Sequence, residues 1–161
     1  MIRPAAPRDI PAIMDFWNPM IRDSIITFSS QEKTAEGLAQ MMADRRRAGR
    51  EFLVAETGGA VVGLASYDQF RAGNGYAHTM EHTIILSPAA QGRGLGRALM
   101  VAIEDHARDA GAHGMIAGVS GENAAGLGFH RALGYRQVGL VPQAGRKFGR
   151  WLDLVLLHKL L

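Results

Sequence analysis

A glycine-rich stretch, Gln91-Gly92-Arg93-Gly94-Leu95-Gly96, is the feature that most constrains the fold of this chain. It follows an apolar run that predicts a strand, His82–Leu86, and it opens a segment with helical periodicity. Glycines let the backbone approach a ligand closely, and the first N–H groups of a helix have no partner inside the helix. Together with the helix dipole, these donors favour a phosphate or pyrophosphate, and Arg93 and Arg97 add positive charge there.

Two common glycine motifs do not fit this stretch. A P-loop requires Lys and then Ser or Thr after its last glycine, whereas Arg97 and Ala98 follow Gly96. A dinucleotide-binding fingerprint needs a further glycine where Arg97 or Leu99 stands. The stretch also lies beyond the middle of the chain, whereas the dinucleotide turn normally follows the first strand. What remains is the pattern Gln-x-x-Gly-x-Gly at the start of a helix.

Turn signals and hydrophobic periodicity divide the rest of the chain into strands and helices. The predicted strands are Ile2–Ala5, Glu51–Glu56, Ala60–Tyr67, Tyr76–Leu86, Met115–Val119, Tyr135–Leu140 and Trp151–Lys159. The predicted helices begin at Pro7, after Thr34 as N-cap, at about Leu95 and at Ala124. Antiparallel strands followed by strand–helix–strand–helix–strand predict an α+β fold with a mixed central sheet flanked by helices, and we expect residues 1–161 to form a single domain.

Composition narrows the class of protein further. The 161 residues include no cysteine, which excludes disulfides, thiolate metal ligands and a cysteine nucleophile. No apolar run approaches the roughly 20 residues of a membrane span, and the N-terminus lacks a signal-peptide pattern. The net charge of +3 is dispersed, apart from a cluster at Arg45-Arg46-Arg47 that suits a helix C-terminus. We therefore expect a cytoplasmic protein with no membrane, nucleic-acid or metal partner.

A second motif begins at Asn123 and reads Asn-Ala-Ala-Gly-Leu-Gly-Phe-His-Arg-Ala-Leu-Gly-Tyr. With the glycine-rich loop it resembles the GNAT superfamily of N-acetyltransferases, in which the loop binds the pyrophosphate of acyl-CoA. Many members carry an Asn that contacts the pantetheine arm, and then a helix ending in Tyr-x-x-Leu-Gly-Phe whose Tyr is the general acid. Asn123 and the segment Leu133-Gly134-Tyr135 match this pattern, and His130 stands where the Tyr would be.

This departure is informative, because it occurs together with two further matches. Glu81-His82 precedes the loop, and Gly145–Asp153 reads Gly-Arg-Lys-Phe-Gly-Arg-Trp-Leu-Asp near the C-terminus. With His130, these segments resemble the phosphinothricin and methionine sulfoximine acetyltransferases over nearly the whole chain, most strongly from Ser66 onward. The resemblance implies the GNAT fold and an acetyl-CoA-dependent N-acetyltransferase that acts on a small amino acid or analogue, and it makes a homodimer the expected assembly.

The resemblance also implies roles for individual residues. Glu81 is the expected base, because an aliphatic ammonium has a pKa close to the ~10.4 of lysine and must lose a proton before attack. His130 is the expected acid, which would supply a proton to the CoA sulfur or shuttle one, although the division of labour within the pair stays open. Transfer would be direct, without an acyl-enzyme. The expected acetyl-CoA contacts are Ile84, Ile85, Leu86, Gln91, Gly92, Arg93, Gly94, Leu95, Gly96, Arg97 and Asn123.

Further residues are expected on the acceptor side. Arg71 would grip a carboxylate bidentately, and the segment at Lys147 would close the other wall, in the same chain or across a dimer interface. The full expected set comprises Phe70, Arg71, Ala72, Glu81, His82, Lys147, Phe148 and Gly149. For Glu81, His130 and Arg71, the alternatives are an exposed strand residue, an interior histidine and a solvated loop arginine.

Two other functions stay open at this point. The acceptor could be a protein N-terminus or a polyamine, although a polyamine site would need several carboxylates, which the segments around Phe70 and Lys147 lack. A non-catalytic acyl-CoA sensor could share the fold, but it would have no need of the pair formed by Glu81 and His130.

Overall fold

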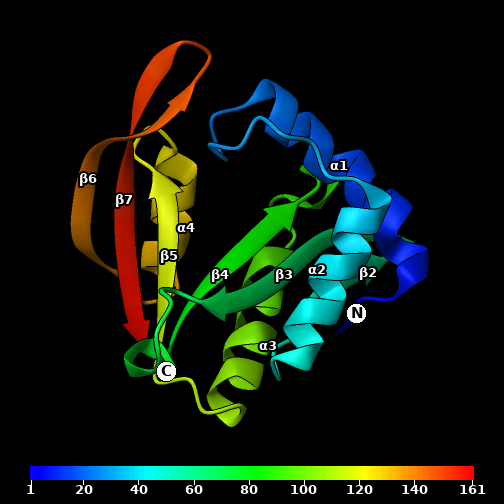
Figure 1. Cartoon of the computed structure of the whole chain (residues 1–161). Helices are drawn as coiled ribbons and strands as arrows, with labels where there is room; N and C mark the ends of the chain where they lie inside the picture. The colour runs from blue at the N-terminus through cyan, green and yellow to red at the C-terminus, as the bar shows by residue number, and fades with distance from the viewer.

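A seven-stranded mixed sheet with helices on both faces forms the framework of the computed structural model, which describes residues 1–161 (Figure 1). The strands are β1 (Ile2–Pro4), β2 (Phe52–Thr57), β3 (Ala60–Gln69), β4 (Thr79–Leu86), β5 (Gly114–Ser120), β6 (Arg136–Lys147) and β7 (Arg150–Leu160). They lie in the order β1-β2-β3-β4-β5-β7-β6. All neighbours are antiparallel except β4 and β5, which the helical crossover makes parallel. The predicted α+β fold is thereby confirmed.

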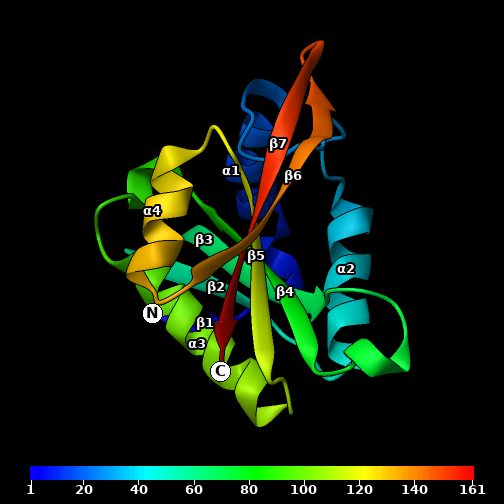
Figure 2. The same ribbon diagram turned by 90° about the vertical axis from the view of Figure 1, so that its left-hand side faces the viewer.

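The helices are divided between the two faces of the sheet (Figures 1 and 2). They are α1 (Ile10–Asp23), α2 (Ala35–Arg47), α3 (Leu95–Asp109) and α4 (Ala124–Ala132). As expected, the Thr34 hydroxyl caps α2, because its oxygen accepts the Gly37 N–H at 3.0 Å. None of the helices combines the length and the apolar character that crossing a membrane requires.

Alternating side chains of the central strands build a separate core on each face. Phe52, Val54 and Leu64 point to α1 and α2, where they pack against Ile13, Trp17, Leu38 and Met42. Leu53, Ala55 and Ala65 point the other way and pack with Leu99, Met100 and Ile103 of α3. Burial on both faces explains why these strands read as nearly continuous apolar runs.

The sheet opens in its middle, where β4 and β5 separate. The parallel register joins only Thr79 to Gly114, Met80 to Met115 and Glu81 to Ile116. Beyond that point β4 stays paired with β3 as far as Leu86, and β5 stays paired with β7 as far as Ser120. The edge of β4 that faces β5 therefore has no strand partner after Glu81, and its backbone donors and acceptors remain available.

Two predicted element bounds were wrong. The strand predicted from Tyr76 begins at Thr79, because Asn74–Tyr76 form a 3₁₀ turn. The strand predicted to end at Leu140 continues to Lys147 and makes a long hairpin with β7. Pro142 lies within this continuation, on an edge strand and in an irregular stretch of the ladder, where its missing N–H costs no hydrogen bond. The first predicted helix opens with a 3₁₀ turn at Pro7–Asp9.

Candidate active site

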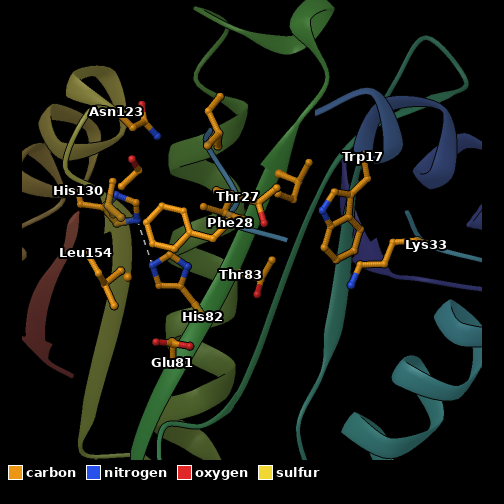
Figure 3. A pocket seen from close by; sticks show the side chains of 16 residues that line it. Trp17, Thr27, Phe28, Lys33, Glu81, His82, Thr83, Asn123, His130 and Leu154 are labelled. Atoms are coloured by element: carbon orange, nitrogen blue, oxygen red, sulfur yellow. Dashed lines mark hydrogen bonds between the residues drawn. The ribbon is translucent and has the colours of Figure 1, made fainter. Parts of the chain in front are cut away.

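A cavity of about 430 Å³ lies where β4 and β5 separate (Figure 3). Its volume is within the range of small-molecule sites. Its walls come from β4, β5, β7, α4, α1 and the segment between α1 and α2. The lining residues are Trp17, Ile26, Thr27, Phe28, Lys33, Glu81, His82, Thr83, Ile84, Ile85, Gly118, Val119, Ser120, Asn123, His130 and Leu154.

The cavity joins the two faces of the sheet, because successive side chains of β4 point in opposite directions. Ile85 packs in the core beneath α1 and α2, so Glu81 and Thr83 point to that face as well. His82 stacks on His130 of α4, and Ile84 packs against the core beneath α3. Glu81 and His82 therefore stand in one cavity but on opposite sides of the sheet.

Glu81 presents its carboxylate to the cavity from the third and last position at which β4 pairs with β5. Its Oε2 lies 3.5 Å from the point that a Cβ on Gly118 would occupy, so the carboxylate lies beside the backbone of β5. The surrounding walls remove part of its water, and this desolvation raises the pKa of Glu81 above its ordinary value. A carboxylate with a raised pKa is a stronger base than one free in water.

His82 and His130 form a buried, stacked pair whose ring centroids are 5.0 Å apart. His130 Nδ1 lies 2.7 Å from the Gly126 carbonyl oxygen, which can only accept, so Nδ1 carries the proton. Burial lowers the pKa of both rings, that of His82 to about 3, so both are neutral at pH 7. His130 Nε2 is then an acceptor, and His82 Nε2 donates to it at 3.1 Å.

This arrangement leaves His82 Nδ1 without a proton and without a hydrogen-bond partner. Tyr135 holds the pair from the side, with its ring 5.8 Å from His82 and 5.4 Å from His130. The Tyr135 hydroxyl donates to the buried carboxylate of Glu104 at 2.8 Å, and Lys159 pairs with that carboxylate at 2.6 Å. Sequence reasoning missed this support, because its members lie far apart in the chain and form no motif.

The glycine-rich loop lies on the α3 and α4 face. Gly92 and Gly94 have φ angles of 73° and 74°, a left-handed conformation that glycine adopts readily. Gly94 is the N-cap of α3 and has no side chain to cap it, so the first N–H groups of α3 lack the usual partner from the N-cap residue. A Cβ on Gly96 would lie 2.9 Å from Leu86 Cδ1 and 3.2 Å from Phe129, so the glycine lets these two side chains pack against the start of α3 in their present positions.

Charged and polar side chains flank this loop. Arg93 reaches the Thr57 hydroxyl at 3.4 Å, and Arg97 reaches the Ala132 carbonyl at 3.3 Å. Neither pairs with a carboxylate within salt-bridge distance. Asn123 lines the cavity and caps α4, since its Oδ1 accepts the Gly126 N–H at 2.9 Å. The loop and Asn123 therefore present donors on the same side of the sheet.

The segment between α1 and α2 supplies one wall of the cavity, which sequence reasoning did not anticipate. It contributes Ile26, Thr27, Phe28 and Lys33, and α1 adds Trp17 (Figure 3). The segment carries no motif, and its place over the cavity depends on contacts with the distant β6–β7 hairpin. Local sequence patterns, such as turn residues and hydrophobic periodicity, do not indicate contacts between segments so far apart in the chain.

Lys147 makes that docking contact and does not line the cavity. Its side chain is buried, and its ammonium donates to the Ile21 carbonyl at 2.6 Å and to the Thr27 carbonyl at 2.8 Å. Burial lowers the pKa of Lys147. Phe28 packs directly on Gly145, where any side chain would collide with its ring. Lys147 thus anchors the wall of the cavity from behind.

The remaining predicted acceptor residues also lie outside the cavity lining of a single chain. Phe70, Arg71 and Ala72 follow β3, where the Phe70 N–H donates to the Thr79 carbonyl at 3.0 Å. The exposed Arg71 guanidinium lies over the Tyr76 ring at 5.4 Å. Phe148 and Gly149 form the tip of the β6–β7 hairpin. Of the predicted acceptor set, the fold brings Glu81 and His82 into the cavity.

Curated proteins of two bacteria resemble this chain along almost its entire length. An L-amino acid N-acyltransferase of Escherichia coli is 38% identical over 157 residues, covering 98% of this chain and 91% of the relative. An L-methionine sulfoximine/L-methionine sulfone acetyltransferase of Salmonella typhimurium is 36% identical, with 98% and 92% covered. The predicted likeness to the methionine sulfoximine acetyltransferases is thereby confirmed.

Solved structures agree in fold. A ribosomal-protein-alanine N-acetyltransferase of Brucella melitensis has a TM-score of 0.96 at 37% identity, covering 100% of this chain and 99% of that one. An acetyltransferase of Salmonella typhimurium, solved with its cofactor acetyl-CoA, has a TM-score of 0.95 at 35% identity, with 100% and 93% covered. The model of the acetyltransferase (GNAT) family matches residues 16–135. This chain belongs to the GNAT family of acetyltransferases.

Proposed function

We propose that this protein, acting as one domain, transfers the acetyl group of acetyl-CoA to the amine of a small amino acid or amino-acid analogue. One observation carries the proposal: the sheet opens at Glu81, so a carboxylate on one face and the His82–His130 pair on the other share one cavity. The names of the curated relatives support an amino-acid acceptor. The acetyl-CoA complex of the Salmonella structure supports the donor.

The face that carries α3 and α4 suits acetyl-CoA, which would supply an activated acetyl thioester. The N–H groups of Gln91–Gly96 and of the first turn of α3 would bind its pyrophosphate, and Arg93 and Arg97 would add positive charge. The free edge of β4 at Ile84–Leu86 would pair with the amides of the pantetheine arm as a strand would. The Asn123 amide lies beside this path.

The other face suits the acceptor. Glu81 would take the proton of the acceptor ammonium, directly or through one water, and its raised pKa makes it the stronger base for that step. The neutral amine would then attack the thioester carbon, and a backbone N–H of Ile84–Leu86 would stabilise the oxyanion. No residue becomes acylated, so the rate would depend largely on how the cavity positions both substrates.

His130 stands on the face of the leaving thiolate, which supports its proposed part in proton transfer. In the resting arrangement its Nδ1–H is bound to Gly126 and its Nε2 accepts from His82, so it has no proton to give. His130 would therefore act as a shuttle: with the His82 N–H turned away, its Nε2 would take the second proton, which the attacking nitrogen loses as the adduct collapses, and pass it to the leaving sulfur. Arg71 does not line the cavity of a single chain, so its contact with the acceptor would require an acceptor that reaches beyond the lining residues.

A second candidate acceptor is the N-terminal amine of a protein. The observation that favours it is the Brucella relative, which is named for a ribosomal protein acceptor. We also propose that the protein is a homodimer, because apolar side chains remain exposed on the β6–β7 hairpin at the edge of the sheet.

The test is thiol release from acetyl-CoA with methionine sulfoximine, methionine sulfone, phosphinothricin, spermidine and an N-terminal peptide. We expect saturable turnover with the amino-acid analogues. Glu81→Gln should lower kcat by about 10²- to 10⁴-fold, the usual contribution of a general base, and leave acetyl-CoA affinity unchanged. Turnover confined to the peptide would select the second acceptor. Binding of acetyl-CoA without turnover of any amine would favour a sensor.

The pH dependence provides an independent check on Glu81. A base acts only when deprotonated, so the wild-type rate should fall as the pH drops through the pKa of Glu81, which lies above the ordinary glutamate value. The residual activity of Glu81→Gln should lack this acid limb. If the variant keeps both normal turnover and the same acid limb, Glu81 is not the base.

A further inference from the structure

We propose that Lys33 binds an anionic group of the acceptor, so that the enzyme selects amines that also carry a carboxylate. The inference rests on the proposed acetyl transfer, in which the amine lies at Glu81. Since His82 and His130 are neutral at pH 7, Lys33 and Glu81 are the only charged side chains among those that line the cavity.

The backbone of Lys33 is held in place by one side chain of α1. The Asn18 Oδ1 accepts the Lys33 N–H at 2.7 Å, and the Asn18 Nδ2 donates to the Lys33 carbonyl at 3.0 Å. These two hydrogen bonds fix Lys33 just before the N-cap of α2, in a segment that otherwise has no regular structure. The position of Lys33 beside the cavity is therefore built into the fold.

The ammonium of Lys33 has no oxygen partner in the chain, which sets it apart from the other two lysines. Lys147 donates to two carbonyls, and Lys159 pairs with Glu104. The Lys33 ammonium instead lies 4.7 Å from the centroid of the buried Trp17 indole. That contact keeps a partly buried cation in the cavity wall while its N–H donors remain free for a ligand.

The two charges stand on different parts of the wall. Trp17 and Lys33 lie on the side opposite His130 and Leu154, and Glu81 lies at the base (Figure 3). An amino acid whose ammonium is at Glu81 would direct its carboxylate, which is attached to the same carbon, toward the Lys33 ammonium on the face of α1 and α2. Such a paired arrangement matches a zwitterionic amino acid, whereas a polyamine would place a cation against Lys33.

The experiment compares methionine sulfone with its carboxamide, which keeps the amine and side chain but lacks the carboxylate. Each is measured with wild type, Lys33→Met, Lys33→Arg and the matched control Arg71→Met. The readouts are KM and kcat from thiol release, and Kd from calorimetry with CoA bound. We expect wild type to prefer the carboxylate by about tenfold or more in KM and Kd, the usual effect of one charge-assisted hydrogen bond.

Lys33→Met should remove this preference by weakening binding of the sulfone alone, with kcat little changed, and Lys33→Arg should largely retain it. If Lys33→Met keeps the preference while the sulfone is acetylated, the role of Lys33 is overturned and the proposed function stands. If Arg71→Met alone removes it, the carboxylate is bound by Arg71 instead. Carboxylate-dependent binding that needs Lys33, without any turnover, would support Lys33 and overturn the proposed reaction. No binding of either compound to wild type would overturn the inference.

Discussion

The buried pair of His82 and His130 makes stability depend on pH at the scale of single residues. Both rings have a pKa below the ordinary value of 6.5, because burial disfavours their charged forms. Below pH 6.5 the unfolded chain gains protons at these rings and the folded chain does not. Stability is therefore fully present above that pH and is lost as the pH falls, by up to about 1.4 kcal/mol per pH unit for each ring.

His82→Gln separates this effect from a general acid response. The glutamine amide N–H can replace the donor to His130 Nε2, but the side chain does not titrate. Between pH 6.5 and 5, the free energy of unfolding from urea titrations should fall less steeply with pH for the variant than for wild type. Equal slopes would show that His82 is not the buried neutral group described above.

At the scale of residues, the sequence motifs predicted the site residues that the motifs themselves contain, but not the contacts between residues far apart in the chain. Glu81, Asn123 and His130 were named from the resemblance, and all three line the cavity. The hydrogen bond between His82 and His130 joins residues 48 positions apart, and it depends on the packing of α4 over β4. Lys33 was not named, because no motif marks it. Its position is set by the two hydrogen bonds with the Asn18 side chain, which form only once α1 and the following segment have folded.

At the scale of elements, the close approach of α3 to its neighbours depends on Gly96. A methyl group there would lie 2.9 Å from Leu86 Cδ1 and 3.2 Å from Phe129, so Gly96→Ala must displace the Leu86 side chain or shift the first turn of α3 away from it. Such overpacking typically costs about 1–3 kcal/mol of folding free energy. Because this turn would bind the pyrophosphate, the KM for acetyl-CoA should rise several-fold, while the KM for the acceptor should change little.

Gly128→Ala in α4 is the matched control. Nothing lies within 4 Å of its added methyl group, and alanine favours a helix by up to about 1 kcal/mol over glycine. We expect equal or greater thermal stability and an unchanged KM for acetyl-CoA. If Gly96→Ala behaves like this control in both measurements, the tight packing at the start of α3 is not required.

The elements were largely predictable because their patterns are local. Strands buried on both faces read as apolar runs, and the Thr34 cap and the glycine-rich loop mark the starts of α2 and α3. The length of β6 was not predictable, because Pro142 is tolerated only at an edge that the sequence does not specify. The separation of β4 from β5 was likewise invisible, since it is a relation between two strands.

At the scale of the whole molecule, the sheet ends in β6, whose outer edge has no neighbouring strand. Val138, Val141, Phe148 and Trp151 on this hairpin are 61%, 43%, 57% and 57% exposed. Free edges and clustered apolar side chains usually mark an interface. We expect sedimentation experiments to show a dimer, and the double variant Val138→Lys, Val141→Lys to shift it to monomer.

Val101→Lys provides the comparison, because Val101 is 49% exposed on α3, away from the hairpin. This variant should sediment as wild type does. A wild-type monomer at micromolar concentration would contradict the proposed assembly. If the hairpin variants are monomeric and their KM for the acceptor rises, residues near Phe148 contribute to the neighbouring subunit's cavity.

The opening between β4 and β5 connects the two faces of the sheet, which affects how reactants would bind and leave. The glycine-rich loop opens to one face, and Trp17 and Lys33 border the other. Under the proposed function, donor and acceptor would approach the cavity from opposite faces, and either product could leave while the other is still bound. A protein built in this way would form a complex of both reactants before chemistry, with intersecting lines in initial-velocity plots, and free CoA would form an unreactive complex with the amine from which either could leave.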